Sequence, residues 1–289
     1  MKEDIESFLT YLVREKRYSP NTLAAYSGDL SQLAAYVESQ SSGEGAGHFK
    51  VGLNSELLLG YMHSLKEKKY APSTIARKVA AAKSFIKFMV DRGKLRGDMA
   101  PNLASPQVSK PLPVTLSVSN VRRLLAEPAK FSTPEARRDK TMLELLYATG
   151  LRVSELMELN VESVDLKSNS VCCSGRNSRV RVIPIDQYTA QIVRDYLDIV
   201  RPELLRNERE VALFLNRRGE RLTRQGFWQI VQGYADKAGL DTKVTPRSLR
   251  HSFAVHKLKG GADLQSIQEL LGHAHISTTR TYKQVELHS

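Results

Sequence analysis

The chain has 289 residues, of which 41% are hydrophobic and 26% charged, as is typical of a soluble globular protein large enough for two domains. Lys and Arg exceed Asp and Glu by 43 to 31, which gives a net charge of +12. Such a charge favours a polyanionic partner such as a nucleic acid, although an anionic membrane surface or solubility alone would also account for it.

Several classes of protein are disfavoured by what the sequence lacks. It contains no run of about 18 apolar residues, so we expect no membrane span, and its first 20 residues are too charged for a signal peptide. Cys172 and Cys173 are adjacent and cannot bridge each other without strain, which favours a reducing cytoplasm. The Cys and His spacings match no zinc site, and no glycine-rich nucleotide motif occurs. We therefore expect neither a metal nor a cofactor.

Four amphipathic helices are predicted in the first hundred residues. Apolar residues recur at helical spacing over 5–13, and Ser19 followed by Pro20 marks the start of a second helix, because Ser caps helices and Pro fits their first position. A third apolar stripe covers 57–65, and a fourth starts near residue 72 and ends near Gly93. This pattern predicts a small all-α bundle over 1–100.

Basic residues lie off the apolar stripe of the fourth helix. They are Arg77, Lys83 and Lys87, and Arg17 in the first turn adds a further cation. Such a face either contacts DNA phosphates or is simply solvated, and the sequence leaves both open.

Two segments are predicted to be irregular. The stretch 41–47, SSGEGAG, is expected to be a flexible loop. The stretch 101–113 holds four prolines and predicts an extended linker, so we place a boundary between domains at 101–115.

The second half, 116–289, is predicted to be mainly helical with one small antiparallel sheet. A long helix over 135–149 should end at Gly150, followed by a turn and a short helix that Ser154 could cap. Two strand-like segments, 170–174 and 180–185, are joined by a hairpin turn. Further elements are helices over 188–200 and 224–238, with a strand-like Leu-Phe-Leu segment between them, and then three or four short helices.

The stretch 245–285 concentrates histidines and arginines beside turns and helix ends, with one late tyrosine, Tyr282. Such a cluster is typical of a site for an anionic substrate. Taken singly, each residue is more often a dipole-complementing cation or a packing residue.

Four segments in order resemble the tyrosine recombinases of the phage integrase family, in their Xer-like branch. These are ATGLRVSEL (148–156), LRHSFA (249–254), ELLGHAHISTTRTY (269–282) and, near the start, SPNTLAAYSGDL (19–30). The resemblance spans almost the whole chain. It implies a SAM-like four-helix core-binding domain that clamps DNA, followed by an α+β catalytic domain, both wrapping a duplex recombination site.

The resemblance also implies a chemistry and an assembly. DNA is broken and rejoined through a 3′-phosphotyrosyl intermediate, without metal or nucleotide, by a tetramer of identical or different protomers. Tyr282 would be the nucleophile, Arg152 and Arg250 would clamp the scissile phosphate, and His273 would donate a hydrogen bond to it. Two guanidinium groups suit this task, because they bind non-bridging oxygens bidentately and stabilise the charge of the transition state.

Four further residues near these motifs are interpreted separately. Glu155 either orients an arginine or is an ordinary solvated helix charge. We expect His251, which follows the second arginine, to be structural. His256 and His275 are expected to be surface or packing residues.

The sequence departs from the family's pattern in two proton carriers. Arg176 stands where the family usually has a hairpin lysine that acts as general acid, and Arg247 stands where it usually has a histidine. Guanidinium groups have pKa values above ~12 and hardly release a proton. General acid/base terms contribute about 10²- to 10⁴-fold each, so we expect good DNA binding with slowed cleavage.

A third departure is that only a short segment follows Tyr282, where Xer-like relatives usually continue into a helix that docks on a neighbouring protomer. The leading hypothesis is a site-specific DNA recombinase. One alternative is an accessory or regulatory DNA-binding protein of the same architecture with impaired strand transfer. Another is a topoisomerase-like relaxing enzyme. The target sequence and the biological role, from chromosome partition to mobile-element integration, are not specified by the sequence.

Overall fold

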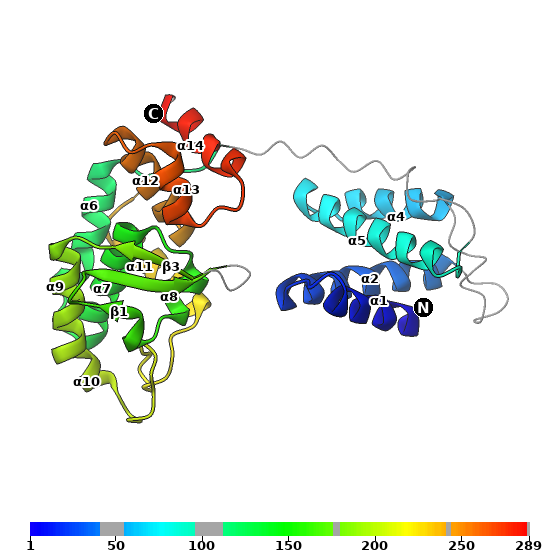
Figure 1. Cartoon of the computed structure of the whole chain (residues 1–289). Coiled ribbons are helices and arrows are strands. Elements are labelled where there is room, and N and C mark those ends of the chain that lie inside the picture. Colours follow the sequence, from blue (N-terminus) through cyan, green and yellow to red (C-terminus); the bar gives the residue numbers. More distant parts are fainter. Residues whose placement is uncertain (41–54, 96–111, 176–179, 241–243, 288–289) are drawn as a thin grey trace. The chain divides into compact units, whose positions relative to one another are not determined.

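The computed structural model describes residues 1–40, 55–95, 112–175, 180–240 and 244–287, and the chain divides into two compact units, Met1–Lys110 and Pro111–Ser289 (Figure 1). Within the described residues both units are mainly helical, and a three-stranded antiparallel sheet lies in the second. The loop expected over 41–47 lies outside the described residues, as does most of the expected linker over 101–115.

The first unit contains four described helices, α1 (Lys2–Arg14), α2 (Pro20–Gln40), α4 (Ser55–Glu67) and α5 (Pro72–Asp91), at the positions that the apolar stripes predict. The Ser19 hydroxyl accepts the Thr22 backbone N–H, so the expected cap of α2 is confirmed. The four helices share one core, in which Phe8 packs against Phe85 and Phe88.

The second unit begins with α6 (Val118–Ala126), a 3₁₀ turn (Glu127–Lys130) and the long α7 (Pro134–Thr149). As predicted, α7 ends at Gly150, which adopts the left-handed conformation with φ +61°. The short α8 (Val153–Glu158) begins earlier than expected, because its N-cap is Arg152, and the prediction of Ser154 as the cap is wrong.

The sheet has the order β1-β2-β3, with β1 (Val164–Asp165) after a 3₁₀ turn (Val161–Ser163), then β2 (Ser170–Ser174) and β3 (Val180–Pro184). The expected antiparallel pairing of the two strands is confirmed, with Cys173 opposite Arg181, while residues 176–179 of the expected turn lie outside the described residues. Side chains alternate along both strands, so Val171 and Ile183 enter the core while Val180 and Val182 are exposed.

The helix expected over 188–200 consists of α9 (Gln187–Asp195) and a wider π turn (Tyr196–Val200), which leads into α10 (Arg201–Leu204). The Leu-Phe-Leu segment is buried but forms no strand among the described residues, since it has only isolated bridges, one at the preceding Ala212 and one at its own Leu215. The chain continues through α11 (Arg224–Lys237), α12 (Pro246–Lys259), α13 (Leu264–Leu271) and α14 (Ile276–Leu287).

Candidate active site

The turn between α7 and α8 fixes the backbone on which the site is built. Gly150 turns the chain where a Cβ would lie 2.4 Å from the Phe253 ring, so both the positive φ and the close approach require glycine. At the start of α8, the side chain of the third helical residue, Glu155, reaches back to the N-cap. Its carboxylate accepts the Arg152 backbone N–H at 2.7 Å. This contact aims the carboxylate of α8 back toward the end of α7.

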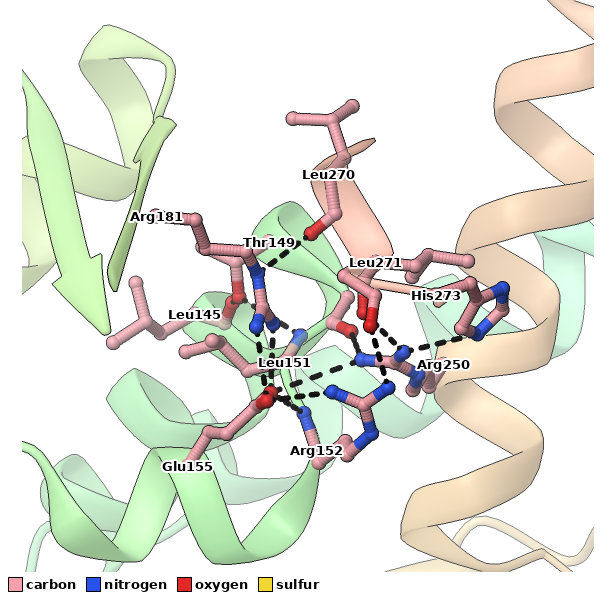
Figure 2. A network of polar contacts seen from close by, with 12 residues as sticks. Leu145, Thr149, Leu151, Arg152, Glu155, Arg181, Arg250, Leu270, Leu271 and His273 are labelled. Atoms are coloured by element: carbon pink, nitrogen blue, oxygen red, sulfur yellow. Dashed lines mark hydrogen bonds and ion pairs between the residues drawn. The ribbon is translucent and has the colours of Figure 1, made fainter. Parts of the chain in front are cut away.

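Three arginines surround the Glu155 carboxylate, which is only 4% exposed (Figure 2). Arg181 binds it with two hydrogen bonds of 2.9 and 2.7 Å, Arg152 donates to it at 2.7 Å, and Arg250 lies 3.9 Å away. Burial opposes the ionised form, but the hydrogen bonds from Arg181 and Arg152 outweigh it and lower the pKa of Glu155 to about 2. Of the two interpretations of Glu155, the structure supports the one in which it orients arginines.

The ends of two helices provide further acceptors for the same arginines. Arg250 donates to the carbonyl oxygens of Gly150, at the end of α7, and of Leu271, at the end of α13. Arg152 donates to Gly272 O at 3.0 Å and Arg181 to Leu270 O at 3.0 Å. Helix C-termini expose unpaired carbonyls with partial negative charge, so they hold buried guanidinium groups well.

Arg250 is the most deeply buried cation of the cluster, with 6% of its surface exposed. Burial, together with repulsion from Arg152, lowers its pKa to about 10. The group is therefore still charged at neutral pH.

Tyr282 is held on α14 in a small apolar cluster with Phe253, Ile267 and Leu271, and it is 2% exposed. Its hydroxyl oxygen lies 2.8 Å from His251 Nδ1. Burial raises the pKa of Tyr282, while the charges of Arg250, Arg247 and Arg152 and a hydrogen bond from Arg250 act against that rise.

His273 lies between Arg250 and Tyr282, and its ring is stacked near the tyrosine ring at a centroid distance of 6.1 Å. Its Nε2 is 3.2 Å from Arg250 Nη2, and its Nδ1 is 3.0 Å from Thr279 Oγ1. Because a guanidinium only donates, Nε2 accepts and the ring proton is on Nδ1. Burial and the charge of Arg250 lower the pKa of His273 to about 4, so the ring is neutral at pH 7.

Beside this arginine cluster lies a cavity of about 380 Å³. Five of the six residues assigned catalytic roles from the sequence line it, namely Arg152, Arg247, Arg250, His273 and Tyr282. They come from the α7–α8 turn, α12 and the region around α14, and all belong to one chain. The sixth, Arg176, lies outside the described residues.

The sequence analysis did not identify one residue of this cluster, and it expected a structural role for another. Arg181 was not singled out, although an arginine at an inward-facing strand position requires a buried carboxylate, and that alternation is visible in the sequence. His251 was expected to be structural, but it contacts the Tyr282 hydroxyl and lines the cavity. His256 is half-buried against Tyr147 and His275 is exposed, as expected.

The basic residues of α5 differ in how free their charges are. Arg77 forms an ion pair with Asp29, a buried carboxylate that also accepts from Lys78 Nζ at 2.9 Å. Lys87 lies 3.7 Å from Asp91 in an exposed pair, and Lys83 is partly exposed. Arg77 thus has much of its charge already neutralised.

The part of the chain that the structure describes contains no group of three or more His, Cys, Asp or Glu side chains arranged to hold a metal ion. Within the same residues, no helix is long and apolar enough to cross a membrane.

Comparison with known sequences agrees over both units. Residues 115–288 match the phage integrase family, and residues 5–93 match the phage integrase N-terminal SAM-like domain. The chain is 48% identical over 284 residues to the tyrosine recombinase XerC of Roseiflexus castenholzii, which covers 98% of this chain and 88% of that protein. It is 38% identical over 286 residues to the tyrosine recombinase XerD of Listeria innocua, and this match covers 99% of this chain and 95% of that protein.

Solved structures share the fold. One is the XerH site-specific recombinase bound to its difH substrate before cleavage, with a TM-score of 0.74, 21% identity, and coverage of 92% of this chain and 78% of that one. Another is a lambda integrase dimer bound to a COC′ core site, with a TM-score of 0.74, 13% identity, and coverage of 98% and 95%.

Proposed function

Since this chain belongs to the phage integrase family and is a site-specific tyrosine recombinase, we propose that Tyr282 is the nucleophile that cuts DNA in the cavity described above. The observation that carries this proposal is the position of the Tyr282 hydroxyl in the same cavity as Arg152 and Arg250 of the same chain. A phenol needs nearby cations to become a good nucleophile at neutral pH, and these two arginines supply them.

The reaction forms a bond between the tyrosine oxygen and the scissile phosphorus while the bond from phosphorus to the 5′ oxygen breaks. Arg152 and Arg250 bind the non-bridging oxygens, whose charge they stabilise in the transition state. The 3′-phosphotyrosyl ester keeps the energy of the phosphodiester, so a free 5′ hydroxyl attacks it in the reverse sense and reseals the strand without ATP.

His273 has to change its partner before it can donate to the phosphate. In the free protein, His273 Nε2 accepts a hydrogen bond from Arg250. We propose that the incoming phosphate replaces Nε2 as the acceptor of this Arg250 hydrogen bond. His273 then donates to the phosphate, either by rotation of its ring or by protonation of Nε2. Arg152, which is 36% exposed, is the more accessible of the two clamps.

Arg176 and Arg247 replace residues that carry protons, and we propose that they act as fixed cations. They strengthen the attraction for the phosphate but transfer a proton poorly, since guanidinium pKa values exceed ~12. Slowed release of the 5′ oxygen is the expected result.

The first unit, residues 1–100, is proposed to clamp the duplex, joined by the linker 101–115 to the catalytic domain 116–289. Arg77, Lys83 and Lys87 are proposed phosphate contacts, with Arg77 the weakest because of its pairing with Asp29. We further propose a tetramer of identical or mixed protomers on paired duplex sites, acting in the cytoplasm, with chromosome partition as one role for a recombinase of this kind.

The test is a suicide DNA substrate, on which the cut strand escapes and the covalent intermediate accumulates. Wild-type protein is expected to form a protein–DNA adduct, and Tyr282→Phe to form none while still binding the same DNA. Tyr234→Phe serves as the matched control, because Tyr234 is a buried tyrosine of the same unit outside the cavity. An adduct that persists in Tyr282→Phe, or its absence from wild-type protein that binds the site, would contradict the proposal.

A further inference from the structure

A chain of two hydrogen bonds connects Arg247 to the proposed nucleophile. Arg247 Nε lies 3.1 Å from His251 Nε2, one turn further along α12, and His251 Nδ1 lies 2.8 Å from the Tyr282 hydroxyl oxygen on α14. The two ring nitrogens of His251 therefore have different partners, Arg247 at Nε2 and Tyr282 at Nδ1.

The chemistry of the outer partner determines the state of the ring. An arginine side chain carries N–H donors and no acceptor, so the contact at Nε2 exists only if Nε2 offers its lone pair. A neutral imidazole has one nitrogen with a lone pair and one with a proton. The proton of His251 is therefore on Nδ1, and the hydrogen bond at Nδ1 runs from histidine to tyrosine.

We propose that Arg247 holds His251 in the tautomer protonated at Nδ1, and that His251 in this state donates a hydrogen bond to the Tyr282 oxygen and stabilises its phenolate instead of taking its proton. This inference rests on the proposed role of Tyr282 as nucleophile. Arg247 acts here as a positioning residue, because it reaches the reacting oxygen through His251.

The proton of Tyr282 leaves by another path. The tyrosine O–H bond breaks and its proton passes to water in the cavity, while the Nδ1–H bond of His251 stays intact. The tyrosine oxygen then attacks phosphorus, and the departing 5′ oxygen takes a proton from water. A donor that keeps its proton stabilises the phenolate and the transition state that develops from it.

The groups around His251 keep its imidazole neutral at neutral pH, so the pattern of one protonated and one unprotonated ring nitrogen persists there. The charged or titratable groups that face it are Arg247 and Arg250 from α12, Tyr282 from α14 and His273 from the turn before α14. Burial and the two arginines lower the pKa of His251 to about 4. Protonation would place a third positive charge among them.

A second histidine of α12, His256, also contacts a tyrosine, Tyr147 of α7, and provides an internal comparison. His256 Nδ1 lies 2.8 Å from the Tyr147 hydroxyl, the same distance as in the His251 pair, but outside the cavity. Burial lowers the pKa of His256, and a hydrogen bond with the Leu116 backbone acts in the opposite direction. Arg247 contacts His251 through Nε2, so the tautomer of His256 should not depend on Arg247.

The tautomers can be measured in the free protein, without DNA. Two-bond ¹H–¹⁵N correlation spectra of full-length protein with ¹⁵N-labelled histidine distinguish protonated from unprotonated ring nitrogens, and His251→Asn and His256→Asn assign the signals. We expect a protonated Nδ1 at His251. In Arg247→Met, His251 should gain protonation at Nε2 while His256 stays as it was. A protonated Nε2 at His251 in wild-type protein, or no change in Arg247→Met, would overturn the tautomer assignment.

The donor role is measured by the rate of adduct formation on a duplex that carries a 5′-bridging phosphorothiolate at the cut site. Sulfur leaves without needing a proton, so the rate reports the nucleophile side alone. His251→Leu is expected to slow the reaction by about 10- to 100-fold, the usual loss of a hydrogen bond to a charged group. Its rate profile should also move to higher pH, because the phenolate forms less readily. His251→Asn presents an amide N–H near the position of Nδ1 and should retain most of the rate.

His256→Leu is the matched control, because it removes the equivalent contact outside the cavity and should leave the rate unchanged. If His251→Asn is as slow as His251→Leu, or if the profile of His251→Leu does not move to higher pH, the donor role is wrong. Failure of wild-type protein to form any adduct while His251 shows a protonated Nδ1 contradicts the proposed function and leaves the tautomer assignment standing.

Discussion

Glu155→Gln removes the charge that holds three arginines together while keeping the shape of the side chain. In the folded protein the pKa of Glu155 is about 2, against an ordinary value of 4.5. At ~1.4 kcal/mol for each pKa unit, this difference corresponds to about 3 kcal/mol of folding free energy at neutral pH. Because the Glu155 side chain is only 4% exposed, solvent screening takes little from that value.

The sign of the pH dependence follows from the direction of the shift. A carboxylate whose folded pKa is depressed contributes its full stability above the unfolded pKa, here 4.5, and loses it as the pH falls toward the folded pKa of about 2. We expect Glu155→Gln to be less stable than wild-type protein by about 3 kcal/mol at pH 7, and by less than half of that at about pH 3.

Urea unfolding measures this difference in the second unit alone. Trp228, in α11, is the single tryptophan of the sequence, so its fluorescence follows the unit that contains the site. Glu158→Gln is the matched control, since Glu158 lies exposed on the same helix, and we expect it to change stability by less than about 0.5 kcal/mol. A Glu155→Gln deficit below 1 kcal/mol at pH 7, or equal deficits at pH 7 and pH 3, would refute the electrostatic account.

Two other changes address the backbone and the hairpin. Gly150→Ala is expected to destabilise the second unit by about 1–3 kcal/mol in the same urea assay, because of the positive φ and because the added Cβ would clash with Phe253. The control is Gly233→Ala, exposed on α11 with nothing within 4 Å of its Cβ position, which should be neutral or stabilising. Equal effects of the two substitutions would contradict this account. Arg176→Lys is expected to speed cleavage of an ordinary phosphodiester suicide substrate by about 100-fold but to leave cleavage of the phosphorothiolate nearly unchanged, and an equal effect on both would show that the residue does not serve the leaving group.

Local rules were sufficient to locate most helices and the hairpin from the sequence. Ser19 with Pro20 and the glycine at position 150 act through the backbone of their own neighbours, so their effect could be read without knowing the fold. The cap of α8 was missed because a carboxylate at its third position, Glu155, satisfies the backbone in place of a cap hydroxyl. That choice depends on the arginines that hold Glu155 in place.

By itself the sequence determined the family, the order of the motifs and the identity of most residues in the cavity, because these depend on residue type and spacing. Only the tertiary structure decided how they are connected. Arg250 meets the Gly150 carbonyl 100 positions away, and Arg181 reaches Glu155 from a strand that no local rule links to α8. The direction of the bond between His251 and Tyr282 depends on what Arg247 does at the other ring nitrogen. A hydrogen bond is set by the positions of both partners, and chain segments far apart in sequence acquire those positions only when the helices pack.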